Sequence, residues 1–589
     1  MTKKTLFILF FLCVSLFYNT KRTNRLDWDV FGYYLYLPAK FIYDDIRLEK
    51  KDQWLTPLIG KYKTTDNLYQ AYKSPKDIYV MKYTMGLAYV YAPFFFIANT
   101  AAPILGYEQD GFSAPYQWLL LFGSVLFSLI GIHYLFKILS IYFSDLVVLI
   151  CMSFIVFGSN YFVMTTSDGL MPHNFVFTFF AVMLYQSIRW YQDQKIKRIV
   201  IIGFCIGIAA LIRPTSVVVA VVPSLWAVGN FEDLKKRIAL FLKNIPQLCL
   251  LAAVAFLVML PQFVYWHSVA GEWLFYSYPD EKLNLLTPHI INVFFSYKKG
   301  WLLYTPIMII ALIGFIRLYK KYPSFFFAIF IFFLVNAYII SCWDCWWYGG
   351  SFAQRPFVES YVFMAFPLAA FIEHMLTKKL RVAMPVFVVC AFFVYLNLFQ
   401  TRQALYGVIH TSLTTKEYYW RVFMKDAASD EDRRWLEPSQ YADGKDETGP
   451  GKTYNTVYGA SLYLDDYSST LNSGNLFSRS LITPTNLGYD ASDHFLITEL
   501  LADTAAAVIS ENVLIYMVTC INKNGNVYKY RSKDYNFRKI KESAGRAQLS
   551  VLMPPQLNNK HYEIVSYVYI NEPAKLKILS FSSKVIKIN

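Results

Sequence analysis

Long runs of apolar residues without charge constrain this chain more than any other feature. Segments such as 118–136, 199–212 and 248–260 contain almost no charged side chain. A helix needs about 17–25 such residues to cross the hydrocarbon layer of a membrane. Only 16% of all residues are charged, whereas soluble domains carry about a quarter. The sequence therefore predicts a polytopic α-helical membrane protein rather than a soluble globular one.

About eleven transmembrane helices are predicted. They cover residues 5–20, 116–136, 144–164, 174–191, 198–213, 215–229, 246–266, 301–317, 324–341, 358–376 and 382–400. Residues 5–20 are read as a retained first helix rather than a signal peptide, because no small-residue cleavage site follows them.

Short clusters of Lys and Arg set the predicted orientation, because such clusters are retained on the cytoplasmic side. With eleven spans, the clusters within 3–4, 189–198, 235–243, 317–321 and 378–381 all fall on one face. The N-terminus is then cytoplasmic, and the site and the C-terminal part are periplasmic, as in a bacterial inner-membrane protein. If the apolar segment 83–105 also crossed the membrane, the basic clusters after it would fall on the opposite face from Lys3 and Lys4. It is therefore predicted to lie on the outer surface, with a twelfth span as the alternative.

The chain is predicted to have three parts. Residues 1–400 form the transmembrane part with a first extracytoplasmic loop at 21–115, residues 401–485 form a polar connecting region, and residues 486–589 form a β-sandwich-like domain. Strands are predicted at 513–521, 527–531, 549–553, 562–570 and 576–588, because these runs are rich in β-branched and aromatic residues. Asn524-Gly525 between two of them is a strong hairpin signal.

The formal net charge of +15 does not indicate a nucleic-acid partner. Most of the basic residues lie in short clusters between apolar runs or in the first loop. Topology and membrane lipids explain such a distribution. Gly203 and Gly207, four residues apart in one span, are predicted to allow close helix packing.

An acidic motif follows the first predicted span directly. Asp27 and Asp29 flank Trp28 ahead of an aromatic run. Burial beside aromatic rings raises the pKa of a carboxylate and makes it a better proton acceptor, so either acid is a candidate catalytic base. The alternative is that Asp27 caps the following helix while Asp29 is solvated.

Basic residues on the predicted outer face are candidates for binding an anion. Arg213 lies between two apolar helices, where an unpaired charge is costly, and a guanidinium suits a phosphate. Lys298, Lys299 and Arg355 precede two further spans. The alternative is nonspecific contact with lipid head groups.

Other outward residues are candidates for binding substrate. Asp168 and His173 lie on the turn before the fourth span, where the alternative is a simple helix start. Asp344, Trp346 and Trp347 lie on an aromatic loop that is suited either to stacking a sugar or to an interfacial belt.

Taken in order, these motifs resemble the GT-C superfamily of membrane glycosyltransferases. The similarity covers about residues 5–400 and is strongest to the polyprenyl-phosphate-dependent branch, which includes protein O-mannosyltransferases and the aminoarabinose transferase of lipid A. It rests on Asp27-Trp-Asp29, the aromatic segment ending in Leu105-Gly106, the Ser-Asp-Gly…Pro-His turn, Arg213-Pro-Thr and Gln354-Arg355-Pro. Here Asp-x-Asp replaces the adjacent Asp-Glu of the mannosyltransferases, so which carboxylate is the base stays open.

The resemblance implies transfer of a sugar from a polyprenyl-phosphate donor to a glycan, lipid or protein acceptor, with inversion. One of the two acids would be the base, and Arg213, Arg355, Lys298 or Lys299 would stabilise the leaving phosphate. Gln354 and the aromatic loop would contact substrate. No cofactor is certain, and a divalent metal is possible because some members require one. The C-terminal part resembles carbohydrate-binding sandwiches more loosely.

Two other functions stay open from the sequence. A transporter or flippase for a lipid-linked saccharide would share the spans and the outward basic groups. An O-antigen ligase or polymerase would transfer sugar from a diphosphate lipid instead.

Overall fold

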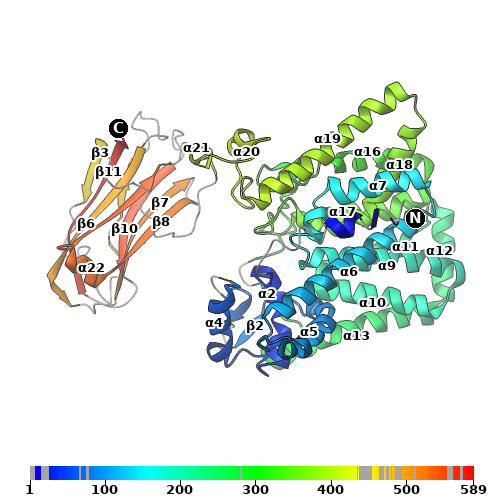
Figure 1. Ribbon diagram of the computed structural model, residues 1–589, viewed down its shortest axis with the longest axis horizontal. Coiled ribbons are helices and arrows are strands. Elements are labelled where there is room, and N and C mark those ends of the chain that lie inside the picture. The colour runs from blue at the N-terminus through cyan, green and yellow to red at the C-terminus, as the bar shows by residue number, and fades with distance from the viewer. Residues whose placement is uncertain are drawn as a thin grey trace. The chain divides into compact units, whose positions relative to one another are not determined.

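The structure is a computed structural model of the chain, and it divides into two compact units, Met1–Ser412 and Leu413–Asn589. It describes residues 5, 7–8, 10–14, 25–65, 68–73, 78–278, 281–433, 435–436, 454–462, 470–471, 477–478, 480–483, 494–508, 513–523, 526–553, 562–570 and 575–588. Each unit is described separately below, and Figure 1 labels the elements of both.

The first unit is almost entirely helical, and its helices fall at the predicted spans. They are α6 (Ala114–Leu139), α7 (Asp145–Gly158), α8 (Tyr161–Thr165), α9 (Pro172–Asp193), α10 (Ile196–Ile212), η1 (Pro214–Ala220), α11 (Val221–Leu225), α13 (Ile245–Ala270), α15 (Trp301–Tyr304), α16 (Ile307–Lys321), α17 (Pro323–Ser341), η2 (Arg355–Ser360), α18 (Tyr361–Leu376) and α19 (Leu380–Leu405). Among the described residues of 5–20, those at 5, 7–8 and 10–14 are helical.

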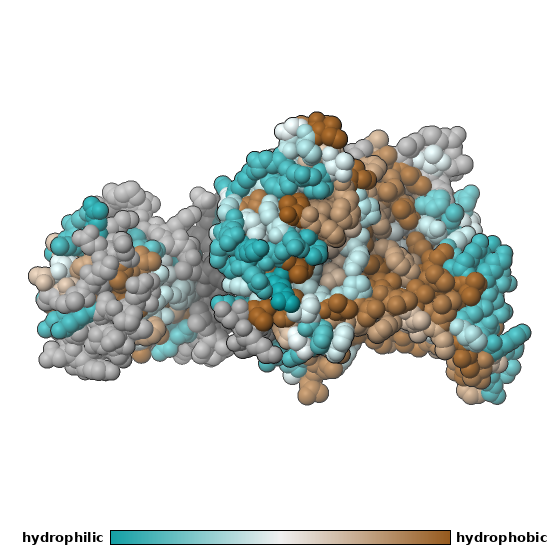
Figure 2. All heavy atoms as spheres, turned by 90° about the horizontal axis from the view of Figure 1, so that it is seen from below, coloured by the Kyte–Doolittle hydropathy of each residue, from teal (hydrophilic) through white to brown (hydrophobic). Residues whose placement is uncertain are grey.

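Six helices in the described part are long and apolar enough to cross a membrane. Figure 2 shows a broad hydrophobic belt on this unit, bordered by hydrophilic surface on either side. The protein is thus a helical integral membrane protein, as predicted. The predicted number of eleven spans is not confirmed, because several of the predicted segments are interrupted or short. The segment 144–164, for example, divides into α7 and α8.

The segment predicted to lie on the outer surface forms α5 (Gly86–Ile104), and it is one of the six long apolar helices. It packs on the N-terminal part of α6, and it also contacts α10 and the first loop. The Tyr116 hydroxyl donates to Asn99 Oδ1 at 2.6 Å, and a side chain at Gly123 would strike Phe94. Helix α5 therefore overlaps the N-terminal part of α6 rather than its full length.

The predicted close packing at Gly203 and Gly207 is confirmed. A Cβ atom at Gly203 would lie 2.7 Å from the Leu251 carbonyl oxygen, and one at Gly207 would lie 2.8 Å from that of Ala255. Both contacts advance by four residues along each helix, so α10 and α13 run parallel with their backbones touching.

The first loop folds as a small cap of short elements. Helices α2 (Trp28–Tyr34), α3 (Tyr36–Phe41) and α4 (Lys51–Tyr62) precede a hairpin of β1 (Ala71–Lys73) and β2 (Tyr79–Met81). The Tyr265 hydroxyl of α13 accepts from the Met81 backbone N–H at 3.0 Å, and Gln262 Oε1 accepts from that of Met85 at 2.8 Å. These bonds attach the end of the cap to the end of α13.

The second unit is a β-sandwich preceded by α20 (Lys416–Val422) and α21 (Asp430–Arg433). Its strands are β3 (Tyr454–Leu462), β4 (Thr470–Leu471), β5 (Leu481–Thr483), β6 (His494–Val508), β7 (Leu514–Lys523), β8 (Asn526–Asn536), β9 (Arg546–Leu552), β10 (Tyr562–Ile570) and β11 (Lys575–Ile588), with α22 (Phe537–Glu542) after β8. One sheet has the order β5-β10-β7-β8, and the other has the order β3-β11-β6-β9 with β4 beside β11.

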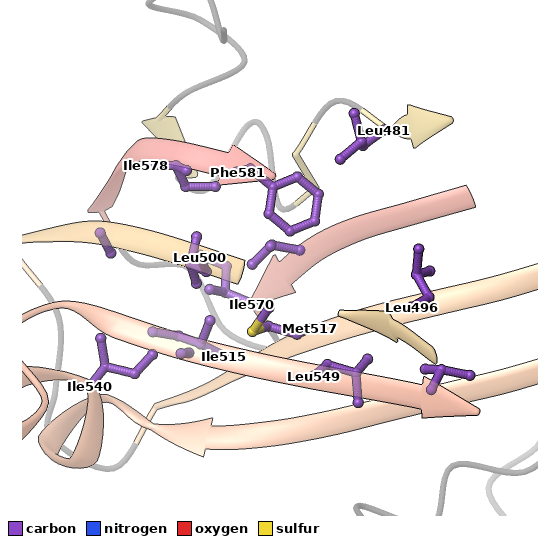
Figure 3. Packing of buried hydrophobic residues seen from close by; sticks show 14 of the residues in the cluster. Leu481, Leu496, Leu500, Ile515, Met517, Ile540, Leu549, Ile570, Ile578 and Phe581 are labelled. Carbon is purple, nitrogen blue, oxygen red and sulfur yellow. The ribbon is translucent and has the colours of Figure 1, made fainter. Parts of the chain in front are cut away.

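The sandwich core lies between the inner faces of these sheets. Figure 3 shows Ile515, Met517 and Ile570 of the first sheet packed toward Leu500 and Phe581 of the second. Along β10 and β11, buried residues alternate with partly or fully exposed ones, which is the pattern of strands with one face in a two-sheet core. The predicted β-sandwich-like fold is thereby confirmed. Strands β3 to β5 come from residues before 486, where the sequence predicted only a connecting region.

The Asn524-Gly525 hairpin signal lies outside the described residues. The strands on either side of it pair in antiparallel fashion, beginning with Lys523 opposite Asn526.

Candidate functional site

An ion pair joins the first loop to the loop before α18. The Arg355 guanidinium donates from Nη2 to Asp29 Oδ2 at 2.6 Å, and the side chains are only 14% and 21% exposed. Asp29 lies in the first turn of α2, and Arg355 begins η2. Two residues 326 positions apart thus meet at one place.

Two tyrosine hydroxyls complete the surroundings of Asp29. Tyr83 and Tyr69 both donate to Oδ1, at 2.7 and 2.8 Å. Burial raises the pKa of Asp29, but the charge of Arg355 and these hydrogen bonds outweigh it and hold the pKa below its usual value. The sequence argument that aromatic burial would raise the pKa of this acid was wrong, because it did not include a buried guanidinium at bonding distance.

The backbone around Asp29 is built for close approach. A Cβ atom at Gly32, one turn later, would lie 2.4 Å from the Tyr83 ring, so only glycine lets Tyr83 reach the acid. Trp28 has φ +47°, which is unfavourable for a bulky residue. Its N–H donates to the Thr64 carbonyl at 2.8 Å, and its half-exposed ring stacks on Tyr69 at 6.5 Å.

A second charged group forms where α10 ends. Pro214 follows Arg213, and the extended backbone of Arg213 (φ −144°, ψ +107°) is what a residue before proline prefers. Arg213 Nη1 donates to Glu359 Oε1 at 3.0 Å. The buried Nδ1 of His173 lies 2.9 Å from the same Nη1 and 3.2 Å from the same carboxylate oxygen.

Tyr33 connects the two charged groups. Its ring lies 4.4 Å from that of Tyr83. Burial raises the pKa of Tyr33 to about 12, while the charges of Arg213 and Arg355 lower it and those of Asp29 and Glu359 raise it. Arg355 and Glu359 also lie four residues apart in the short helix η2, so the Asp29–Arg355 and Arg213–Glu359 pairs are neighbours.

Lys299 lies beside this site but inside the protein. Its ammonium donates to the carbonyl and, at 3.0 Å, to the hydroxyl of Ser351. Burial, and then the positive charge of Arg355, lower the pKa of Lys299 well below its usual value, and the charge of Asp168 opposes this. The Lys298 side chain lies over Trp347, with its ammonium 4.5 Å from the ring centroid.

The aromatic loop divides into a site-facing and an outward part. Gln354 is fully buried and donates to the Trp346 carbonyl at 3.0 Å, next in sequence to Arg355. Asp344 is exposed and accepts from the Lys282 backbone N–H at 3.1 Å. Trp346 and Trp347 pack edge to face at 5.8 Å. Asp344 thus tethers a neighbouring loop in this structure.

Asp27 occupies the N-cap position of α2 without a side-chain capping bond, and its carbonyl accepts from the Phe31 N–H at 3.1 Å. The alternative that Asp27 marks the helix start therefore fits its position, although the capping bond itself is not formed. Asp29, which the same alternative treated as solvated, is instead mostly enclosed and paired with Arg355.

Several residues of the site escaped the sequence argument. Glu359 is buried at the start of a predicted span, and an acid at the edge of a membrane helix is itself a functional signal. Tyr33, Tyr69 and Tyr83 are three among 46 tyrosines, and nothing in their spacing distinguishes them.

A metal does not fit the residues that the structure describes. Among them, no group of three or more His, Cys, Asp or Glu is placed to hold an ion. The two carboxylates of the site are each occupied by an arginine.

Comparison with known proteins supports the resemblance over part of the chain. Residues 112–266 match the family of dolichyl-phosphate-mannose-protein mannosyltransferases. This segment runs from α6 to α13 and contains Asp168, His173 and Arg213. It confirms for these residues the predicted resemblance to membrane glycosyltransferases of the GT-C superfamily.

Among solved structures, the chain is similar to ArnT from Cupriavidus metallidurans in its apo state. The TM-score is 0.36 at 14% sequence identity, and the match covers 69% of each chain. No curated protein matches the sequence.

Proposed function

We propose that this protein is a glycosyltransferase that moves a sugar from a polyprenyl-phosphate donor to a hydroxyl of a periplasmic acceptor, which is a glycan, a lipid or a protein. The observation that carries the proposal is the Asp29–Arg355 ion pair at 2.6 Å, with Arg213 paired to Glu359 on the same short helix as Arg355. A proton acceptor beside two guanidiniums is what an in-line displacement of a lipid phosphate requires. The match of residues 112–266 to the mannosyltransferase family supports the same class.

Asp29 is the proposed base. Asp29 is not the nucleophile. Its carboxylate takes the proton from the acceptor hydroxyl while that hydroxyl oxygen attacks the anomeric carbon. The bond from this carbon to the phosphate oxygen breaks, and the configuration is inverted. An incoming donor phosphate competes for Arg355. As Arg355 turns to the phosphate, Asp29 loses the main opposing charge, its pKa rises and it becomes a better base.

Arg213 and Arg355 are the proposed ligands of the leaving phosphate. A guanidinium offers two parallel donors to phosphate oxygens, and stabilising the developing charge is often the largest contribution to catalysis. Lys298 joins them from the rim. Lys299 is the remaining candidate, and in this structure its amine is held by the hydroxyl of Ser351.

Buried acceptors near these arginines are suited to sugar hydroxyls. Glu359 Oε2 and Gln354 Oε1 are buried and have no hydrogen-bond partner among the described residues. Such atoms normally meet a donor. His173 orients Glu359, and the half-exposed Trp28 offers a stacking face beside Asp29.

The remaining substrate contacts are proposed farther out. Trp346 and Trp347 would stack a second ring, and Asp168 and Asp344 would bind hydroxyls at the rim. Asp27, at a helix start, takes no part in the proton transfer.

The proposal is tested by mass spectrometry of periplasmic glycans and lipids from cells lacking the gene and carrying plasmid copies. Wild-type and Asp27→Asn should restore the same sugar-modified product, and Asp29→Asn should not. Full restoration by Asp29→Asn refutes the proposed base. The absence of any glycoconjugate change on deletion refutes the enzyme.

The same variants separate transfer from transport. A flippase should keep exporting its lipid-linked saccharide when Asp29 is neutral, because moving a head group needs no proton acceptor. Accumulation of unreacted donor on the periplasmic side in Asp29→Asn cells therefore indicates transfer.

A further inference from the structure

Helix α12 (Phe231–Lys243) lies at the end of the helical unit opposite the candidate site. Helix α10 reaches the site at Arg213 and begins just after Gln194. At that far end, Asn244, which directly follows α12, donates to Gln194 Oε1 at 3.2 Å. Figure 1 likewise shows α12 at the edge of this unit away from α2 and α4.

The outward face of α12 is apolar. Phe231, Ile238 and Leu242 are 71%, 51% and 64% exposed. Their spacings of seven and four residues put them in one row along the helix. Three separate large side chains exposed to this extent on one short helix are unusual for a surface in water.

Lysines accompany the apolar row. Lys235, Lys236 and Lys243 are exposed, and the Lys235 ammonium lies 5.0 Å from the Phe231 ring centroid. The acids of the helix are confined to its first turn, where Asp233 accepts from the Gly229 backbone N–H at 3.1 Å. Glu232 lies 4.0 Å from the Lys236 ammonium, and beyond the first turn every charged side chain of the helix is basic.

Arg237 fixes which way the helix faces. Its side chain is buried, donates from Nη2 to the Trp226 carbonyl at 2.5 Å, and stacks 3.7 Å from the Tyr191 ring centroid. Asn230 caps the helix by accepting from the Asp233 N–H at 2.9 Å. With Arg237 held under the helix, the apolar row is turned away from the rest of the protein.

We propose that α12 lies in the membrane interface on this side and binds anionic phospholipids, with the apolar row among the acyl chains and the three lysines on the head groups. Helix α13, one of the long apolar helices, begins directly after Asn244, so α12 is at the depth where a membrane helix starts. An amphipathic helix of this composition is suited to an anionic surface. This inference is independent of the proposed reaction.

The test uses the full-length protein in nanodiscs of phosphatidylcholine with or without phosphatidylglycerol, and native mass spectrometry counts the lipids that stay bound. Wild-type protein should retain phosphatidylglycerol in preference. Each lysine contributes about fivefold, or about 1 kcal/mol, at an anionic surface. The triple variant Lys235→Gln, Lys236→Gln, Lys243→Gln should therefore lose at least about tenfold of this preference.

The control neutralises three exposed lysines of the first loop, Lys50, Lys63 and Lys73, and should keep the preference. An equal loss in both triple variants would overturn the proposal, because it would show a general charge effect.

Photo-cross-linking tests the apolar row separately. A benzophenone side chain at Ile238 should form adducts with lipid, and one at Lys236 should form far fewer. Adducts of Ile238 with another protein, or equal lipid adducts at both positions, would show that the row does not lie in the bilayer.

Discussion

Neutralising the Asp29–Arg355 pair tests the architecture of the site directly. Two unit charges about 4 Å apart attract by about 4 kcal/mol at the effective dielectric constant of about 20 that suits partly buried groups. Both side chains are mostly enclosed, so the pair is screened little by solvent. Removing one partner leaves the other charge buried, which typically costs about 3–5 kcal/mol.

The measurement is a double-mutant cycle on the free energy of unfolding in detergent micelles. Asp29→Asn and Arg355→Gln should each destabilise the protein by about 3 kcal/mol. The double variant should be more stable than the sum of the two losses by about 2–4 kcal/mol, because the second substitution removes a charge already stranded.

The exposed pair Lys40–Asp44 in the same loop provides the control, since its side chains are 53% and 85% exposed. Its cycle, Lys40→Gln with Asp44→Asn, should show no measurable coupling. Additive losses in the Asp29–Arg355 cycle would refute the pairing and with it the site.

Three further predictions follow from the same geometry. Gly32→Ala should push Tyr83 off Asp29 and lower activity at least about tenfold. Gly60→Ala in α4 is the control, because an added Cβ there meets nothing within 4 Å. It should leave activity unchanged and slightly raise the unfolding temperature. Arg213→Gln should lower kcat, measured by release of polyprenyl phosphate, about a hundredfold or more, and Arg213→Lys should recover part of this loss. A kcat of Arg213→Gln equal to that of the wild type would exclude Arg213 as a phosphate ligand. Because the pKa of Asp29 is lower folded than unfolded, its pair should add stability above about pH 4 and lose it as the pH falls further. Unfolding temperatures from pH 3 to 7 check this, and Asp29→Asn should flatten that part of the curve.

Much of the fold follows from sequence because lipid permits few solutions. A run such as 116–136 must be helical, since no water in the bilayer satisfies its backbone, and α6 has that position. Strand β6 is harder to predict. Its end, Leu501-Ala-Asp-Thr-Ala-Ala-Ala, favours helix on propensity alone, and the pairing of β6 with β11 overrides it through irregular register.

In the site too, local sequence patterns identify single residues but not the distant residues with which they pair. Arg213 is predictable because a cation at a helix end before proline is costly without an anion. Its partner Glu359 lies 146 residues away, and only the folded packing of α9, α10 and η2 brings them together. The sign of the pKa shift of Asp29 was missed for the same reason, because Arg355 is a contact that no local pattern encodes.

The glycine contacts between α10 and α13 limit how this protein can move. A carrier that opens alternately to the two sides of a membrane rocks one bundle of helices against another. Here, no such movement can pass between α10 and α13 without sliding two backbones that touch at Gly203 and Gly207, so any rocking would have to use another helix interface. The two helices therefore move as one body, and they hold Arg213 and the attachment of the first loop at a fixed separation.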